Sequence, residues 1–131
     1  MTHGLILFAH GARDPAWAAP FETVAAYVRQ RCPGRHVRLA FLEFMPPTLS
    51  EAGALLAEVG CGRVDVVPMF LGTGGHVRRD LPLLLESLRA AHPAVQFTLQ
   101  TAIGEVESVQ LAMADSVAAT VASIPAQGDQ G

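Results

Sequence analysis

Lysine is absent from this sequence, and all nine basic residues are arginine. Without lysine the chain cannot form a Walker phosphate loop, a Schiff base or a lysine general base, so these chemistries are excluded. Arginine is the side chain suited to gripping a carboxylate through two parallel hydrogen bonds. We therefore expect any anionic ligand to be held by guanidinium groups.

Other features are scarce as well. No apolar stretch reaches the roughly 20 residues that cross a bilayer, and the first residues lack the basic region of a signal peptide. The net charge of −3 argues against general nucleic-acid binding. The two cysteines, Cys32 and Cys61, form no CxxC motif, which favours free thiols over a disulfide or a metal pair. We expect a cytoplasmic protein with no membrane or nucleic-acid partner.

The order of apolar runs predicts an α/β fold. Half of the 131 residues are hydrophobic, which suits strands buried on both faces of a sheet. Predicted strands at 5–9, 36–44, 63–71 and 95–100 alternate with predicted helices at 15–32, 48–59, 80–92 and 105–124. Right-handed crossovers then give one doubly wound, parallel four-stranded sheet with helices on both faces. We expect a single domain over 1–124 and a disordered tail over 125–131.

Capping residues place the starts of the predicted helices. Asp14 before Pro15 is a helix N-cap, and Thr48 with Glu51 forms a capping box. Asp80, two residues before Pro82, is predicted to begin the third helix. Asp14 and Asp80 are therefore interpreted as caps rather than as catalytic acids.

Two histidines follow strand-like runs inside glycine-rich turns. His10 ends the run 5–9, and His76 follows the run 63–71 through four residues that include three glycines. In an open α/β sheet, ligands bind at the loops that follow the carboxyl ends of the strands. Two imidazoles at such positions form a candidate pair for metal binding or proton transfer.

Further polar residues accompany the histidines. Glu43 ends the second predicted strand, and Arg13, Arg78 and Arg79 lie close to the histidines in sequence. Plainer interpretations stay open: a polar strand cap for His10, an exposed loop residue for His76, a solvated edge carboxylate for Glu43 and ordinary surface charges for the arginines. The remaining histidines are predicted to lie at the opposite edge and to have no role: His3, His36 and His92.

Three segments resemble one family. They are His10-Gly11-Ala12-Arg13-Asp14 after the first strand, Phe41-Leu42-Glu43 before a proline-bearing helix start, and Val67-Pro68-Met69-Phe70-Leu71 leading through glycines to His76, Asp80 and Pro82. Their order and spacing are similar to those of the class II tetrapyrrole chelatases, specifically the short sirohydrochlorin chelatases. The family often has serine at the position of Ala12, and residues 101–105 follow its pattern only loosely.

The resemblance implies a function. Members of the family insert Co²⁺ or Fe²⁺ into sirohydrochlorin, in cobalamin or sirohaem biosynthesis. Long members carry two similar halves, and short members assemble as homodimers. By motif, His10 and His76 would bind the metal and accept protons, with Glu43 as a further ligand. The metal would be a substrate, cobalt first, and no organic cofactor would be needed.

The residues themselves are compatible with that chemistry. Imidazole and carboxylate ligands suit Co²⁺, Fe²⁺ and Ni²⁺ alike, and two or three of them leave positions open for pyrrole nitrogens. Arg13, Arg78 and Arg79 would bind the carboxylates of the macrocycle. Three alternatives remain: a metal-dependent hydrolase, a non-catalytic metal or tetrapyrrole carrier, and a phosphohistidine enzyme. The last lacks an arginine directly before His10.

Overall fold

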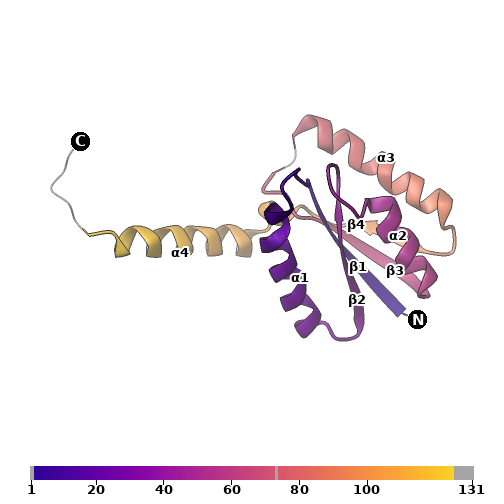
Figure 1. Ribbon diagram of the computed structural model, residues 1–131, viewed down its shortest axis with the longest axis horizontal. Coiled ribbons are helices and arrows are strands. Elements are labelled where there is room, and N and C mark those ends of the chain that lie inside the picture. Colours follow the sequence, from indigo (N-terminus) through magenta and orange to yellow (C-terminus); the bar gives the residue numbers. More distant parts are fainter. Residues whose placement is uncertain (1, 73, 126–131) are drawn as a thin grey trace.

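The computed structural model describes residues 2–72 and 74–125, and its sheet has the predicted architecture (Figure 1). Four parallel strands form one sheet in the order β2-β1-β3-β4. The strands are β1 (Thr2–Ala9), β2 (Arg35–Phe41), β3 (Cys61–Pro68) and β4 (Gln96–Leu99). The helices are η1 (Pro15–Ala18), α1 (Ala19–Arg31), α2 (Leu49–Glu58), α3 (Gly75–Ala91), η2 (Ile103–Glu105) and α4 (Glu107–Ser123). The predicted doubly wound α/β class is confirmed.

The apolar sequence of β1 suits its central position in the sheet. A strand with neighbours on both sides and helices on both faces must be apolar on both faces. Within β1, Ile6 and Phe8 are fully buried and Leu7 is 4% exposed. The strand pairs with β2 on one side and β3 on the other. The loops that follow these three strands therefore lie next to one another.

Helices cover the two faces of the sheet unequally. Ile6 and Phe8 pack in a large cluster with buried residues of α2 and α3, including Leu56 and Leu85. Leu7 points to the other face and packs with Ala25 of α1. Figure 1 shows α1 on one side of the sheet and α2 with α3 on the other. One face therefore has two helices and the other has one.

Two of the predicted caps are present. The Asp14 carboxylate accepts a hydrogen bond from the Ala16 amide at 2.9 Å and begins η1. The Thr48 hydroxyl accepts from the Glu51 amide at 3.1 Å, while the Glu51 carboxylate accepts from the Thr48 amide at 2.9 Å. These reciprocal bonds satisfy amide donors at the start of α2 that have no partner within the helix.

The predicted start of the third helix is wrong. Helix α3 begins at Gly75, so Asp80 is not its N-cap and Pro82 lies inside it. Gly74 is in an extended conformation, and its carbonyl accepts the first helical bond from the Arg78 amide at 2.9 Å. The prediction began the helix at Asp80 because the proline two residues later favours a first turn. Tertiary packing of Leu81 and Leu85 outweighs the donor that Pro82 lacks.

The second strand also ends earlier than predicted. It stops at Phe41, and Glu43 lies in the loop beyond it rather than in the sheet. The Phe41 amide donates to the Pro47 carbonyl at 2.9 Å, which closes this loop, and Phe44 has a positive φ of 70°. The third strand, predicted over 63–71, ends at Pro68 and begins two residues earlier, at Cys61.

The last helix is present but stands apart from the sheet. The sequence predicted one helix over 105–124. The structure has the short helix η2 followed by α4, which begins at Glu107. Figure 1 shows α4 extending away from the rest of the molecule. Of the predicted tail 125–131, residues 126–131 lie outside the described part of the chain. No helix within the described residues is both long and apolar enough to span a bilayer.

Candidate functional site

The loops after β1 and β2 bring His10 and Glu43 together at the carboxyl edge of the sheet. The Glu43 amide donates to the His10 carbonyl at 3.0 Å, and the Leu42 amide donates to the Ala9 carbonyl at 2.9 Å. These bonds continue the pairing of the two strands past their ends. Both His10 and Glu43 are exposed. The backbones of these two predicted site residues therefore lie on adjacent loops.

Gly11 allows the loop that carries Glu43 to lie close to the loop that carries His10. Its φ of +88° lies in the left-handed region, and a Cβ at this position would overlap the Glu43 carbonyl oxygen. Glycine alone combines that conformation with that contact at low cost. The glycine after His10 thus fixes how closely the Glu43 loop approaches the histidine.

Phe70 supports the imidazole of His10 from the third loop. The two rings stack, with centroids 4.2 Å apart and planes inclined by 29°. Phe70 is only 2% exposed and also packs on Phe8, with ring centroids 6.0 Å apart. Sequence reasoning missed this role because it placed Phe70 inside the third strand. Its apolar character beside the glycine turn was the available signal.

His76 reaches the same edge by its backbone. It lies in the first turn of α3, directly after the loop that follows β3. Its side chain lies outside the described part of the structure. Among the described residues, no group of three His, Cys, Asp or Glu side chains could hold a metal ion. The predicted pairing of the His10 and His76 imidazoles therefore stays a prediction.

The three predicted arginines are distributed around this edge. The Arg13 guanidinium lies over the ring of Phe44, 5.1 Å from its centroid, and Phe44 is 56% exposed. Arg78 lines a cavity of about 260 Å³ together with Gln100, and Arg79 is exposed on α3. Sequence reasoning did not single out Phe44, an exposed aromatic residue in a strained backbone conformation. Such residues cluster at ligand sites.

The other histidines lie where they were predicted. His3 and His36 lie near the amino-terminal ends of β1 and β2, where they pair with Arg35 and Gly4 respectively, and His92 follows the end of α3. This is the edge opposite His10. Burial raises the pKa of the Cys61 thiol, near that same far edge. A thiol kept protonated is a poor metal ligand.

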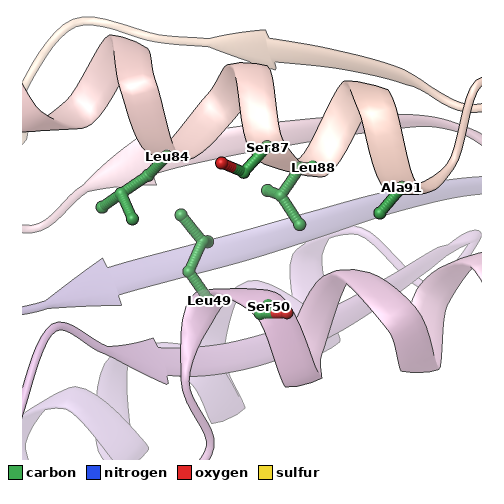
Figure 2. A pocket seen from close by; sticks show the side chains of 6 residues that line it. All are labelled: Leu49, Ser50, Leu84, Ser87, Leu88 and Ala91. Carbon is green, nitrogen blue, oxygen red and sulfur yellow. The ribbon is translucent and has the colours of Figure 1, made fainter.

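The cavity between α2 and α3 does not suit a large ligand. Figure 2 shows it lined by Leu49 and Ser50 of α2 and by side chains of α3. Its volume is about 70 Å³, whereas small-molecule sites usually measure roughly 300–1,000 Å³.

The fold defines a doubly wound, parallel α/β protein, a class in which ligands bind at the carboxyl edge of the sheet. The sequence model of the CbiX family matches residues 4–120. The chain belongs to this family. The resemblance to sirohydrochlorin chelatases deduced from the motifs is confirmed.

Similar proteins include two sirohydrochlorin cobaltochelatases. The protein from Methanopyrus kandleri is 37% identical over 81 residues, which are 62% of this chain and 57% of that protein. The protein from Saccharolobus solfataricus is 33% identical over 112 residues, which are 81% of this chain and 86% of that protein. The match to the M. kandleri protein thus spans little more than half of its length.

Solved structures show the same fold. A cobalamin biosynthesis CbiX protein from Marinobacter aquaeolei has a TM-score of 0.83 and 31% identity, covering 93% of this chain and 99% of that one. SirB from Bacillus subtilis with Fe³⁺ has a TM-score of 0.79 and 21% identity, covering 95% of this chain but 49% of that one. This chain therefore corresponds in fold to about half of SirB.

Proposed function

We propose that this chain inserts Co²⁺, or alternatively Fe²⁺, into sirohydrochlorin at the carboxyl edge of its sheet. The observation that carries the proposal is the hydrogen bond from the Glu43 amide to the His10 carbonyl, 3.0 Å long. It sets an imidazole and a carboxylate on adjacent loops of a CbiX-family fold. The relatives named sirohydrochlorin cobaltochelatase support the substrate and favour cobalt. The proposed location is the cytoplasm, and the proposal invokes no organic cofactor.

His10 and His76 would bind the metal, with Glu43 as a third ligand. Imidazole nitrogen and carboxylate oxygen suit Co²⁺ and Fe²⁺. Three protein ligands leave coordination positions open, which pyrrole nitrogens can enter. A site closed by four ligands would retain the ion instead. The stacked Phe70 ring limits the orientations of the His10 imidazole, which favours one binding geometry.

The same histidines would accept the protons that the macrocycle loses. Metallation forms bonds from the pyrrole nitrogens to the metal and breaks two pyrrole N–H bonds, so two protons leave and no electrons transfer. Neutral imidazole, with an ordinary pKa of about 6.5, is a suitable acceptor near neutral pH. An imidazole that holds the metal and then releases it to the ring becomes free to take a proton.

Arginines at the edge would bind the substrate carboxylates. Sirohydrochlorin is planar and carries carboxylates around its rim, and guanidinium binds such groups through two hydrogen bonds. Arg13 lies on the β2 side of the edge, whereas Arg78 lines the cavity beside Gln100 that follows β4. The spacing of these charges on both sides of His10 suits a wide, flat ligand.

A homodimer would complete the site. SirB has about twice the length of this chain, which covers 49% of it. A ring bound at one exposed edge would remain open to water on its other face. A second copy facing that edge would supply the missing cover, as the second half of a longer chain would.

Metallation spectroscopy tests this function. Sirohydrochlorin and Co²⁺ are mixed with the protein, and the absorbance change is compared with the uncatalysed rate. We expect His10→Ala and His76→Ala each to abolish the acceleration. His36→Ala, an exposed histidine at the opposite edge, is the matched control and should keep the wild-type rate.

The same assay separates the alternatives. A carrier would bind the ring or the metal without accelerating metallation, and a hydrolase would show no dependence on sirohydrochlorin. If wild type gives no acceleration, or if both histidine variants metallate the ring as fast as wild type, the proposed function is wrong.

A further inference from the structure

The start of α3 leaves the role of Asp80 open. The helix begins at Gly75, five residues before Asp80, so this carboxylate does not cap the amides of the first turn. The attraction between an acid and the positive end of a helix also falls off within the first turn. Asp80 is nonetheless half-buried, whereas carboxylates mostly lie in water. Its position therefore needs another explanation.

Asp80 lies on the flank of α3 that faces α2 and the loop after β2. One cavity of about 300 Å³ is lined from this loop and from this flank, by Leu42, Asp80, Leu83, Leu84 and Ser87. Figure 2 shows Leu84 of the same flank directed toward Leu49 of α2. Leu42 is followed directly by Glu43, so the flank runs past the loop that carries a proposed metal ligand.

The backbone places His76 one turn before Asp80 on the same flank. The two residues are four positions apart within α3, and side chains at this spacing are neighbours, with Cβ atoms about 5–6 Å apart. The other residues of α3 that stand three or four positions from Asp80 are apolar, namely Val77, Leu83 and Leu84. Of these four neighbours in the helix, His76 is the one whose side chain can donate a hydrogen bond to a carboxylate.

A carboxylate at this spacing can decide which nitrogen of an imidazole is offered to a metal. A neutral imidazole has an N–H on one ring nitrogen and a lone pair on the other, and the metal binds the lone pair. In metal sites, a hydrogen bond from that N–H to a carboxylate fixes the tautomer and the orientation of the ring. His10 has a different support, the stacked ring of Phe70.

We propose that Asp80 positions His76: its carboxylate accepts a hydrogen bond from one ring nitrogen, which leaves the lone pair of the other nitrogen for the metal. Asp80 touches neither the metal nor the macrocycle, so it is a positioning residue. The inference rests on the proposed function, because it takes His76 to be a metal ligand. It adds that the two histidines are oriented by different means, His10 by an aromatic ring and His76 by a carboxylate.

A double-mutant cycle on metal binding tests this role. The full-length protein is titrated with Co²⁺ alone, and the d–d absorption of the bound ion gives the Kd. We expect Asp80→Ala to weaken binding about 10–100-fold when His76 is present. In the His76→Ala background the same substitution should change the Kd by no more than about twofold, because the carboxylate then has no imidazole to orient.

Glu86→Ala is the matched control for this titration. It removes a carboxylate from an exposed position of the same helix, and it should bind Co²⁺ as wild type does. Circular dichroism verifies that the variants stay folded. An equal loss in Glu86→Ala would show that the charge of the helix, and not the position of Asp80, matters, and it would overturn the proposal.

Two further results of the titration would overturn it. If Asp80→Ala binds Co²⁺ as tightly as wild type, the carboxylate positions nothing. If Asp80→Ala loses the same factor with and without His76, the carboxylate acts independently of the histidine, as a ligand or through the fold. Both results leave the metallation rates of wild type, His10→Ala and His76→Ala untouched, so this inference can fail while the proposed function stands.

NMR of the histidine rings supplies a measurement that needs no metal. The metal-free, ¹⁵N-histidine-labelled protein is studied at about pH 8, above the ordinary imidazole pKa of about 6.5, and the His76 signals are assigned by their loss in His76→Ala. We expect ring-nitrogen shifts of one tautomer in wild type and of a mixture in Asp80→Ala. Asp80→Asn keeps the shape with a weaker acceptor and should lie between them. Unchanged His76 shifts in both Asp80 variants would overturn the proposal.

Discussion

The imidazole of His10 lies on the ring of Phe70, with centroids 4.2 Å apart and planes inclined by 29°. The two residues follow different strands, β1 and β3, so the contact exists only because these strands are neighbours. Phe70 is almost completely buried, whereas His10 is exposed. The buried ring of Phe70 thus supports the exposed imidazole of His10 at the edge where the metal is proposed to bind.

Removing the Phe70 ring tests this support. We expect Phe70→Leu to lower kcat for metallation by roughly tenfold, about 1.4 kcal/mol, because the imidazole gains orientations that do not bind the metal. Phe97→Leu is the matched control, since Phe97 is equally buried in the same core cluster but contacts His92 instead. Steady-state metallation rates would reveal the difference. Equal rates in both variants would show that the stacking has no role.

Gly11 is predicted to be irreplaceable by alanine. A methyl group there meets the Glu43 carbonyl at a φ of +88°, so Gly11→Ala should lower the free energy of unfolding by at least about 2 kcal/mol. It should also reduce metallation by displacing the Glu43 loop. Gly34→Ala is the control, because nothing lies within 4 Å of a Cβ at Gly34. Urea unfolding of both variants checks the prediction, and a neutral Gly11→Ala would contradict it.

Phe44 is predicted to lower the stability of the fold through its backbone strain while its exposed ring contributes to ligand binding. Its φ of 70° is strained for any residue with a Cβ. Phe44→Gly should therefore be more stable than Phe44→Ala by roughly 1 kcal/mol. Both variants should raise the KM for sirohydrochlorin because both remove the exposed ring. Urea unfolding measures the difference. If Phe44→Ala has the same urea midpoint as Phe44→Gly, or a higher one, the backbone at this position is not strained.

The arginines of α3 are predicted to bind substrate rather than to react. Arg78→Ala with Arg79→Ala should raise the KM for sirohydrochlorin on the order of tenfold or more, since a charged hydrogen bond is worth about 1.5–3 kcal/mol. The change in kcat should be smaller. Arg31→Ala with Arg38→Ala removes the same charge from two exposed positions away from the carboxyl edge, so it controls for net charge. An unchanged KM in the α3 variant would remove these arginines from the binding site.

The capping box of α2 predicts a local acid sensitivity. Hydrogen bonds from Thr48 lower the pKa of the Glu51 carboxyl. A lowered folded-state pKa contributes stability above the ordinary pKa of Glu, and this contribution is lost as the pH falls through the folded value. Glu51→Gln should remove this part of the pH dependence below about pH 5. Thermal unfolding between pH 3 and 7 measures it, and parallel profiles for wild type and variant would contradict the prediction.

Local patterns predicted much of the fold. The apolar run of β1, the Asp14 cap and the Thr48–Glu51 box depend on residues close together in the chain, and each is present. The start of α3 was missed because Pro82 favours a helix start locally, while the packing of Leu81 and Leu85 against the sheet extends the helix to Gly75. The Phe70 support was missed because the prediction placed Phe70 inside the third strand, whereas it lies in the loop after β3 and contacts the loop after β1.

The sequence by itself determined the parallel α/β class, the family and the residue types offered at the carboxyl edge, because periodicity, caps and motifs are local properties. Only the tertiary structure decided that β1 lies between β2 and β3, that the Glu43 amide bonds to the His10 carbonyl, and that no residue of α4 is buried. These features depend on packing between distant segments. Strand order and helix direction are set by the total area that the folded chain buries, which no short window of sequence contains.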